Sequence, residues 1–188
     1  MNQKRRLEEV RWHGRGGQGA VLGASMLGSA VALYEGKHAV SFPSFGAERR
    51  GAPVQAFTRI SDHAIRTRSQ IYHPTIIIVL DDTLLDVVNI TDGARDGANI
   101  LVNTRKSADK LAGIPHSLNV TTVDATAIAR EHIGVAIVNT AMLGALAGAT
   151  DIVSLDSIKK AIAGTLPEKI VDRNIAAAEA AYQEVRGK

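Results

Sequence analysis

A glycine-rich stretch near the start of the chain is the strongest candidate for chemistry in this sequence. Gly14, Gly16 and Gly19 satisfy the pattern G-x-G-x-x-G between a predicted strand and a predicted helix. Glycines allow the backbone to approach a phosphate closely, and the N–H groups and dipole at the start of a helix attract an anion. Arg15 and Gln18 add a charged and a neutral hydrogen-bond donor. We therefore predict a phosphate-binding loop made of Gly14, Arg15, Gly16, Gly17, Gln18 and Gly19. The alternative is a tight strand-to-helix turn packed against a partner.

The surroundings of this loop argue against simple NAD binding. A nicotinamide dinucleotide site requires an acidic residue near the end of the second strand, where it holds the ribose hydroxyls. The predicted second strand runs into residues 41–45, which contain no acid, and Glu35 lies at the end of the preceding helix. An additional phosphate, as on NADP or coenzyme A, could instead meet Arg49 and Arg50.

A second loop carries these two arginines. Residues 43–53 are too rich in glycine, proline and charge for regular structure. Arginine forks bind carboxylates and phosphates bidentately, and Phe42 and Phe45 could form an apolar wall beside them. Arg49 and Arg50 are therefore a second candidate anion site or an interface, against the alternative of a solvated turn in which Glu48 pairs with one arginine.

The remaining polar residues offer weaker candidates. His13 could transfer protons, although a packed or capping histidine is the favoured interpretation. Asp81 and Asp82 are better explained as helix caps than as a carboxylate pair, and Asn139 could either cap a helix or approach a ligand. The six histidines have no metal-ligand spacing, and no nucleophile motif occurs. The sequence predicts an anion-binding chain with no catalytic residue and no metal ligand of its own.

The predicted elements that position these loops alternate between strands and helices. We expect strands over residues 10–13, 39–42, 54–60, 75–80, 99–103 and 120–123, and helices over 20–34, 82–88, 125–132, 139–149, 155–164 and 168–185. The continuous β-branched run at 75–80 is typical of a strand covered on both faces. We predict one α/β, Rossmann-like domain over residues 1–188, with a mainly parallel sheet flanked by helices and a C-terminal helical segment.

Composition excludes several classes of protein. The 188 residues contain no cysteine, so disulfides, thiolate metal sites and iron–sulfur ligation are excluded for this chain. Residues 1–75 carry a net charge of +6 and residues 76–188 a net charge of −3, which suggests that the first part faces an anion. Aromatic residues are scarce, which argues against a nucleic-acid partner. No signal peptide or membrane-spanning run is visible, so we expect a cytoplasmic protein that does not bind a membrane.

The two loops together resemble a known family. The stretches RWHGRGGQGA at 11–20 and FPSFGAERRGAPV at 42–54 closely resemble the gamma subunit of 2-oxoacid:ferredoxin oxidoreductases, with the pyruvate synthase branch nearest. The stretches at 57–61 and 66–70 are also similar to this family. The resemblance extends over the whole chain, whose length suits a free-standing gamma subunit.

This resemblance implies one part of a larger enzyme. Members of the family oxidatively decarboxylate a 2-oxo acid with coenzyme A, yielding acyl-CoA, carbon dioxide and reduced ferredoxin. The resemblance places thiamine diphosphate between the alpha and beta subunits and [4Fe-4S] clusters on the beta and delta subunits. It assigns phosphate cradling to Gly14 through Gly19, and a coenzyme A or inter-subunit contact to Arg49 and Arg50. The 2-oxo acid, which could be aromatic, and the acceptor, ferredoxin or NAD, stay open.

Two other functions compete with this hypothesis. The first is a self-sufficient NADP-binding dehydrogenase, which the missing strand-end acid and the missing catalytic set disfavour. The second is a nucleic-acid-binding module that uses the basic first part, which the scarcity of aromatic residues and the lack of a known motif disfavour.

Overall fold

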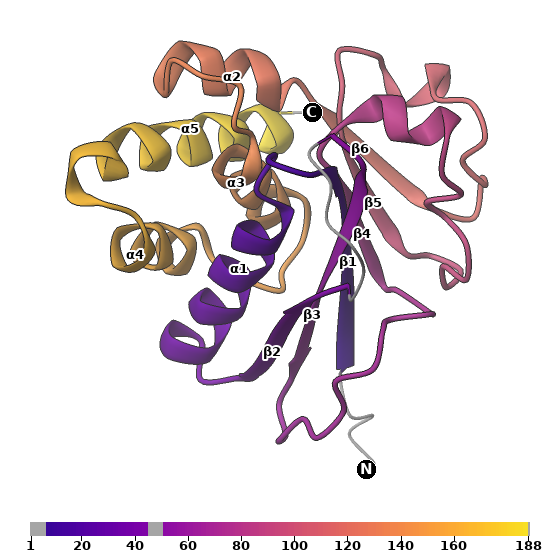
Figure 1. Cartoon of the computed structure of the whole chain (residues 1–188), viewed down its shortest axis with the longest axis horizontal. Coiled ribbons are helices and arrows are strands. Elements are labelled where there is room, and N and C mark those ends of the chain that lie inside the picture. The colour runs from indigo at the N-terminus through magenta and orange to yellow at the C-terminus, as the bar shows by residue number, and fades with distance from the viewer. Residues whose placement is uncertain (1–6, 45–50, 188) are drawn as a thin grey trace.

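The computed structural model describes residues 7–44 and 51–187, which have a layered α/β fold. Figure 1 shows the six-stranded sheet nearly edge-on. The five α-helices of the described residues all lie on one side of it. The strands are β1 (Leu7–Arg15), β2 (His38–Pro43), β3 (Pro53–Ser61), β4 (Ile76–Val79), β5 (Asn99–Asn103) and β6 (Asn119–Val123). The helices are α1 (Ala20–Tyr34), α2 (Ala125–His132), α3 (Asn139–Ala149), α4 (Leu155–Thr165) and α5 (Glu168–Arg186), with short 3₁₀ helices η1 (Asp82–Asp86) and η2 (Ala108–Lys110).

The sheet has the order β2-β3-β1-β4-β5-β6 and is mainly parallel. Strands β1, β4, β5 and β6 pair in parallel, whereas β3 pairs antiparallel with both β1 and β2. The predicted α/β fold, the mainly parallel sheet and the C-terminal helical segment are confirmed. The structure differs in one respect: on the second face of the sheet, the described cover consists of η1, η2 and irregular segments instead of α-helices.

Strand β4 explains how the two faces are filled. Ile76 and Ile78 face the α-helices, while Ile77 and Val79 pack with Leu84 on the opposite face. All four residues of the strand are buried. The run at 75–80 predicted a strand covered on both faces, and this prediction is confirmed.

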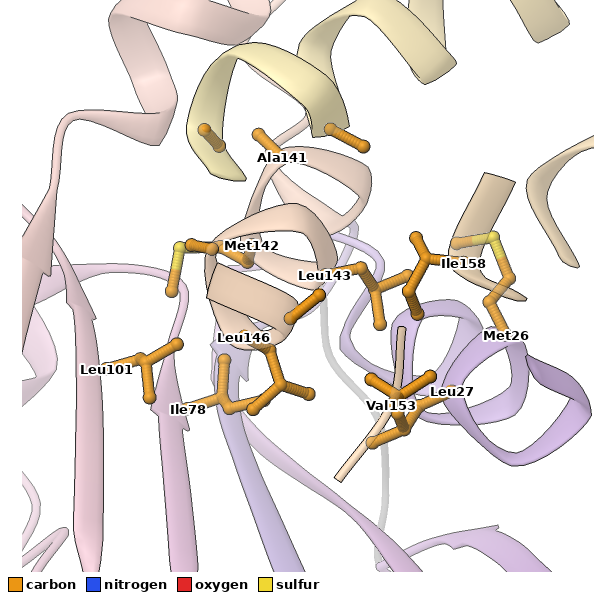
Figure 2. Packing of buried hydrophobic residues seen from close by; sticks show 14 of the residues in the cluster. Met26, Leu27, Ile78, Leu101, Ala141, Met142, Leu143, Leu146, Val153 and Ile158 are labelled. Carbon is orange, nitrogen blue, oxygen red and sulfur yellow. The ribbon is translucent and has the colours of Figure 1, made fainter. Parts of the chain in front are cut away.

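Helix α3 lies at the centre of the larger core. Figure 2 shows Met142 and Leu146 pointing toward Ile78 and Leu101 of the sheet, and Leu143 pointing toward Ile158 of α4. Residues 139–147 of this helix are all buried, which is why its sequence is apolar or small all round. At Gly144 the helix crosses α5 so closely that a Cβ atom would collide with the backbone of Ala178.

Most element boundaries agree with the prediction from sequence. The exception that bears on function is β1, which continues to Arg15 and so includes two residues of the predicted glycine loop. The helix predicted over 82–88 is the shorter 3₁₀ helix η1, capped by the side chain of Asp81, which accepts a hydrogen bond from the backbone N–H of Thr83.

Candidate anion-binding site at the carboxyl ends of β1 and β4

The glycine loop occupies the turn between β1 and α1. Gly16 continues the pairing of β1, because its N–H donates to the carbonyl oxygen of Ala52 at 3.0 Å. Gly17 and Gly19 have φ angles of +96° and +81°, in the left-handed region that favours glycine. The predicted turn is therefore present, with Gly17 to Gly19 at its tip and Gly14 within the strand.

Gly19 is required for a second reason. A Cβ atom on this residue would lie 2.6 Å from the side-chain nitrogen of Asn139, at the start of α3. Asn139 is buried and its Oδ1 accepts a hydrogen bond from the backbone N–H of Thr140. Its Nδ2 donates to the carbonyl oxygen of Gly19 at 3.4 Å, so Asn139 links the start of α3 to the loop.

The first turn of α1 can accept an anion. The first N–H groups of a helix have no intrahelical acceptors. Among the described residues, no side chain caps those of α1, and its first turn contains no acidic residue. A cavity of about 410 Å³ lies beside it, lined by Gly17, Gly19, Leu22, Ser25 and Val54 among others. Backbone donors, a helix dipole and an apolar wall thus meet at one place, as a phosphate with an attached apolar group requires.

Arg15 and Gln18 both bind Asp81. Arg15 Nε lies 3.2 Å from Asp81 Oδ2, and Gln18 Nε2 donates to the same oxygen at 2.8 Å. Arg15 also donates from Nη2 to the hydroxyl of Thr83, and Gln18 Oε1 accepts a hydrogen bond from the backbone N–H of Arg15 at 2.7 Å. These two side chains therefore hold the glycine loop against the end of β4.

The Asp81 carboxylate is kept ionised by this arrangement. Partial burial alone would raise the pKa of Asp81, but hydrogen bonds from Thr83 and Gln18, together with the charge of Arg15, lower it below its ordinary value. The prediction that Asp81 caps a helix is confirmed, and sequence reasoning missed its second role at the glycine loop. The sequence shows that Asp81 follows a predicted strand, but it does not show that this strand pairs with β1.

The sheet topology explains why a crevice forms here. After β1 the chain passes to the helical face through α1, whereas after β4 it passes to the opposite face through η1. Adjacent parallel strands whose connections diverge create a crevice at their carboxyl ends, where open α/β sheets usually bind ligands. Arg15, Gln18 and Asp81 bridge the base of this crevice. A further cavity of about 450 Å³ continues past Asp81 over the ends of β5 and β6, and Asn103, Arg105 and Asp124 are among its lining residues.

His13 is a packed residue. It is 2 % exposed, and Arg11 Nε donates to its Nε2 at 3.1 Å. Burial and the neighbouring Arg11 lower the pKa of His13 to about 3 from its ordinary 6.5. His13 is thus neutral near pH 7. Its burial agrees with the favoured interpretation of the sequence, in which this histidine is a packed or capping residue.

Three of the positive charges in the first part of the chain are used inside the fold. Arg59 is 5 % exposed and pairs with Glu9 at 3.0 Å. Arg11 is 6 % exposed and donates from Nη2 to the carbonyl oxygens of Ile90 and Asp92. Together with Arg15, these residues show that part of the charge asymmetry has a structural origin.

The second candidate loop is described only at its two ends. Arg49 and Arg50 fall outside the described residues, as do Phe45 and Glu48. The position that an acid would occupy in a dinucleotide site, the end of β2, is Pro43. Of the predicted site residues, the structure therefore describes the six of the glycine loop but not Arg49 and Arg50.

The described residues contain neither a metal-binding cluster nor a helix suited to a membrane. Within residues 7–44 and 51–187, no three His, Asp or Glu side chains are grouped so that they could hold a metal ion. None of the helices in this described part has both the length and the apolar character needed to cross a bilayer.

Comparison with known proteins identifies relatives over nearly the whole chain. Residues 9–184 match the family described as pyruvate ferredoxin/flavodoxin oxidoreductase. The chain is 51% identical over 180 residues to the pyruvate/ketoisovalerate oxidoreductases common subunit gamma of Thermococcus kodakarensis, covering 94% of this chain and 96% of the relative. It is also 51% identical over 180 residues to the pyruvate synthase subunit PorC of Methanocaldococcus jannaschii, covering 96% of this chain and 98% of the relative.

A solved structure agrees with these sequence relationships. The crystal structure of pyruvate oxidoreductase subunit PORC from Thermotoga maritima superposes with a TM-score of 0.82 at 40% sequence identity, covering 96% of this chain and 97% of that one. Fold, length and sequence therefore agree over nearly the whole of both chains. The chain belongs to the pyruvate ferredoxin/flavodoxin oxidoreductase family and, within it, to the gamma subunits of the 2-oxoacid:ferredoxin oxidoreductases.

Proposed function

We propose that this chain is a non-autonomous subunit of an enzyme that oxidatively decarboxylates a 2-oxo acid with coenzyme A to acyl-CoA and carbon dioxide. The electrons pass to ferredoxin or to NAD through partner subunits of the alpha, beta and delta type. The relatives named pyruvate synthase subunit PorC favour pyruvate as the substrate. A relative named as common to pyruvate and ketoisovalerate oxidoreductases supports the view that the choice of 2-oxo acid resides on the partners.

The cofactors of this reaction would be held by the partners. Thiamine diphosphate supplies the carbanion chemistry of decarboxylation and iron–sulfur clusters carry the electrons. This chain has no cysteine with which to ligate a cluster. The acid and the histidine nearest the glycine loop, Asp81 and His13, already have internal partners, so neither is proposed as a catalytic residue.

The contribution that we assign to this chain is to hold part of coenzyme A and to contact the other subunits. The observation that carries the assignment is the uncapped start of α1 beside the cavity of about 410 Å³. Backbone N–H groups near Gly17 and Gly19 would bind a phosphate, and Leu22 and Val54 would cover an apolar part of the coenzyme. Arg15 contributes indirectly, because its bonds to Asp81 and Thr83 fix the loop in this shape.

The test uses the assembled complex, since the chain alone should neither decarboxylate nor reduce. Gly17→Val places a branched side chain at the loop, where the structure has open space around the added Cβ. We expect the KM for coenzyme A to rise by about tenfold with little change in the KM for the 2-oxo acid.

Gly97→Val is the matched control. Gly97 also has a positive φ, of +76°, and open space around an added Cβ. It lies just before β5, at the amino end of this parallel strand, whereas the glycine loop lies at the carboxyl end of β1. It reproduces the backbone strain without touching the loop. An unchanged KM for coenzyme A in Gly17→Val, or an equal rise in both variants, would refute the role of the loop. Turnover by the isolated chain would refute the proposed function.

A further inference from the structure

The connection between β3 and β4 is long and irregular, yet it is held firmly. Residues 62–75 contain no helix or strand. Connections of this length without regular structure are uncommon in compact domains, and those that are ordered usually serve a function. The segment leaves β3 beside Leu7 and enters β4 beside Val10. Both of its ends therefore lie toward the amino end of β1, whereas the glycine loop follows its carboxyl end.

One buried arginine fixes the middle of this segment. Arg59 donates from its guanidinium to the carbonyl oxygens of Ser69 at 2.6 Å and Gln70 at 3.2 Å. The same side chain pairs with Glu9, and its guanidinium lies 5.7 Å from the ring centroid of Phe42. Burying a charged group is costly unless it is paired and hydrogen-bonded, and here the segment's own backbone supplies the acceptors.

A second buried arginine fixes the following residues. Arg11 approaches the carbonyl oxygen of Ile71 from the segment and donates to those of Ile90 and Asp92 from the neighbouring loop. Ile71 itself is 2 % exposed and serves as an apolar anchor. Two buried cations thus hold an irregular backbone in one shape, which lowers the entropic cost of ordering it when a partner binds.

The side chains that this segment presents to solvent are those of a binding surface. Arg66 and Arg68 are exposed, and Tyr72 is 64 % exposed. Arg95 is close to the segment, since its backbone N–H donates to the carbonyl oxygen of Pro74, and half of its side chain is exposed. Arginine and tyrosine are among the residue types enriched at the centres of protein interfaces. Asp62 is the single acid among residues 62–75.

We propose that residues 66–72 form a preorganised docking surface for an acidic face of a partner subunit, with Arg66 and Arg68 making the charged contacts. The inference rests on the proposed function, because it locates one of the subunit contacts which that function requires. A basic surface is matched by a carboxylate-rich one, and such charge complementarity sets the orientation and rate of association.

The experiment measures assembly of the co-expressed complex with the wild-type chain, with R66E/R68E and with the milder R66Q/R68Q. We expect R66E/R68E to raise the dissociation constant of this chain from its partner subunits by about tenfold or more, with R66Q/R68Q intermediate. Wild-type assembly should also weaken with salt more steeply than that of R66Q/R68Q. Both arginines are exposed, so thermal unfolding of the isolated variants should match that of the wild type.

The matched control is K169E/R173E, which reverses two exposed charges on α5, on the helical side of the sheet. It should assemble like the wild type. Unchanged assembly of R66E/R68E overturns the proposal, and a raised KM for coenzyme A with unchanged assembly assigns these arginines to the coenzyme instead. Failure of the proposed function is distinguishable, because the wild-type chain itself would then not join the complex.

Discussion

Arg15 and Asp81 form an ion pair of 3.2 Å that joins the ends of the two central parallel strands, β1 and β4. The pair lies where the connections after these strands turn to opposite faces of the sheet. It positions the glycine loop, because Gln18 donates to the same carboxylate oxygen. The shape of the candidate anion site therefore depends on a residue 66 positions away in the sequence.

Asp81→Asn should loosen this loop. The substitution keeps the size of the side chain but removes the charge that faces Arg15, leaving a partly buried cation without its partner. We expect a loss of about 1–3 kcal/mol in the free energy of unfolding, measured by urea denaturation, with faster amide exchange over residues 15–20. Asp82→Asn is the control, because Asp82 accepts a hydrogen bond from the Thr104 hydroxyl, which an asparagine oxygen can also accept. Equal losses in the two variants would contradict the role of the ion pair.

The buried histidine predicts a pH dependence of stability. His13 has a pKa of about 3 in the folded chain against an ordinary 6.5, so between these values the unfolded chain binds a proton that the folded chain does not. Stability should therefore fall as the pH drops from 6.5 toward 3, by about 1 kcal/mol per pH unit from this group. His13→Gln, whose amide oxygen can accept the hydrogen bond from Arg11, should have a shallower slope between pH 6 and pH 4. An identical slope for both proteins would show that His13 does not titrate in this way.

Two neighbouring glycines should respond differently to the same substitution. Gly17→Ala adds only backbone strain, because its Cβ would meet nothing within 4 Å, and should cost about 1 kcal/mol. Gly19→Ala adds a collision with Asn139 and should cost about 2–4 kcal/mol. Thermal unfolding of both variants measures the difference. The double variant Gly19→Ala/Asn139→Ala should cost less than the sum of its single substitutions, and strict additivity would contradict this contact.

The crossing of α3 and α5 should be intolerant of a single methyl group. Gly144→Ala would place a Cβ against the backbone of Ala178 and should lower the free energy of unfolding by about 2–4 kcal/mol. Gly164→Ala is the matched helix substitution, since its Cβ would approach only the Tyr34 hydroxyl, at 3.9 Å, and should stabilise the protein by about 0.5–1 kcal/mol. Calorimetry of the two variants measures both the expected loss of stability in Gly144→Ala and the expected gain in Gly164→Ala. Stabilisation by Gly144→Ala would mean that the helices can separate at no cost.

The sequence was most informative where the deciding interactions are local. The sequence predicted a small-residue helix over 139–149 and a short strand over 99–103, and the structure has α3 and β5 over the same residues. The same holds for the cap at Asp81, whose partner Thr83 is two residues away. Such features depend on neighbouring side chains and backbone dihedral angles, which the sequence specifies directly.

The arginines were predicted less well because their environment is not local. Arg11 and Arg59 lie in strands among apolar residues and count toward a basic first part of the chain. Their burial depends on carbonyl oxygens from the segments after β3 and β4, which approach only when the sheet has formed. Net charge alone cannot distinguish a cation that awaits a ligand from one already bound inside the fold.

By itself, the sequence determined the α/β class, the turn from β1 to α1 with its glycines, and the absence of cysteine chemistry on this chain. Only the tertiary structure decided that Arg15 and Gln18 serve Asp81, that His13 is neutral, and that residues 62–75 are held by buried arginines. The physical reason is the strand order β2-β3-β1-β4, which places β4 beside β1 although two strands separate them along the chain. Pairing across that distance brings together charges whose proximity no local pattern encodes.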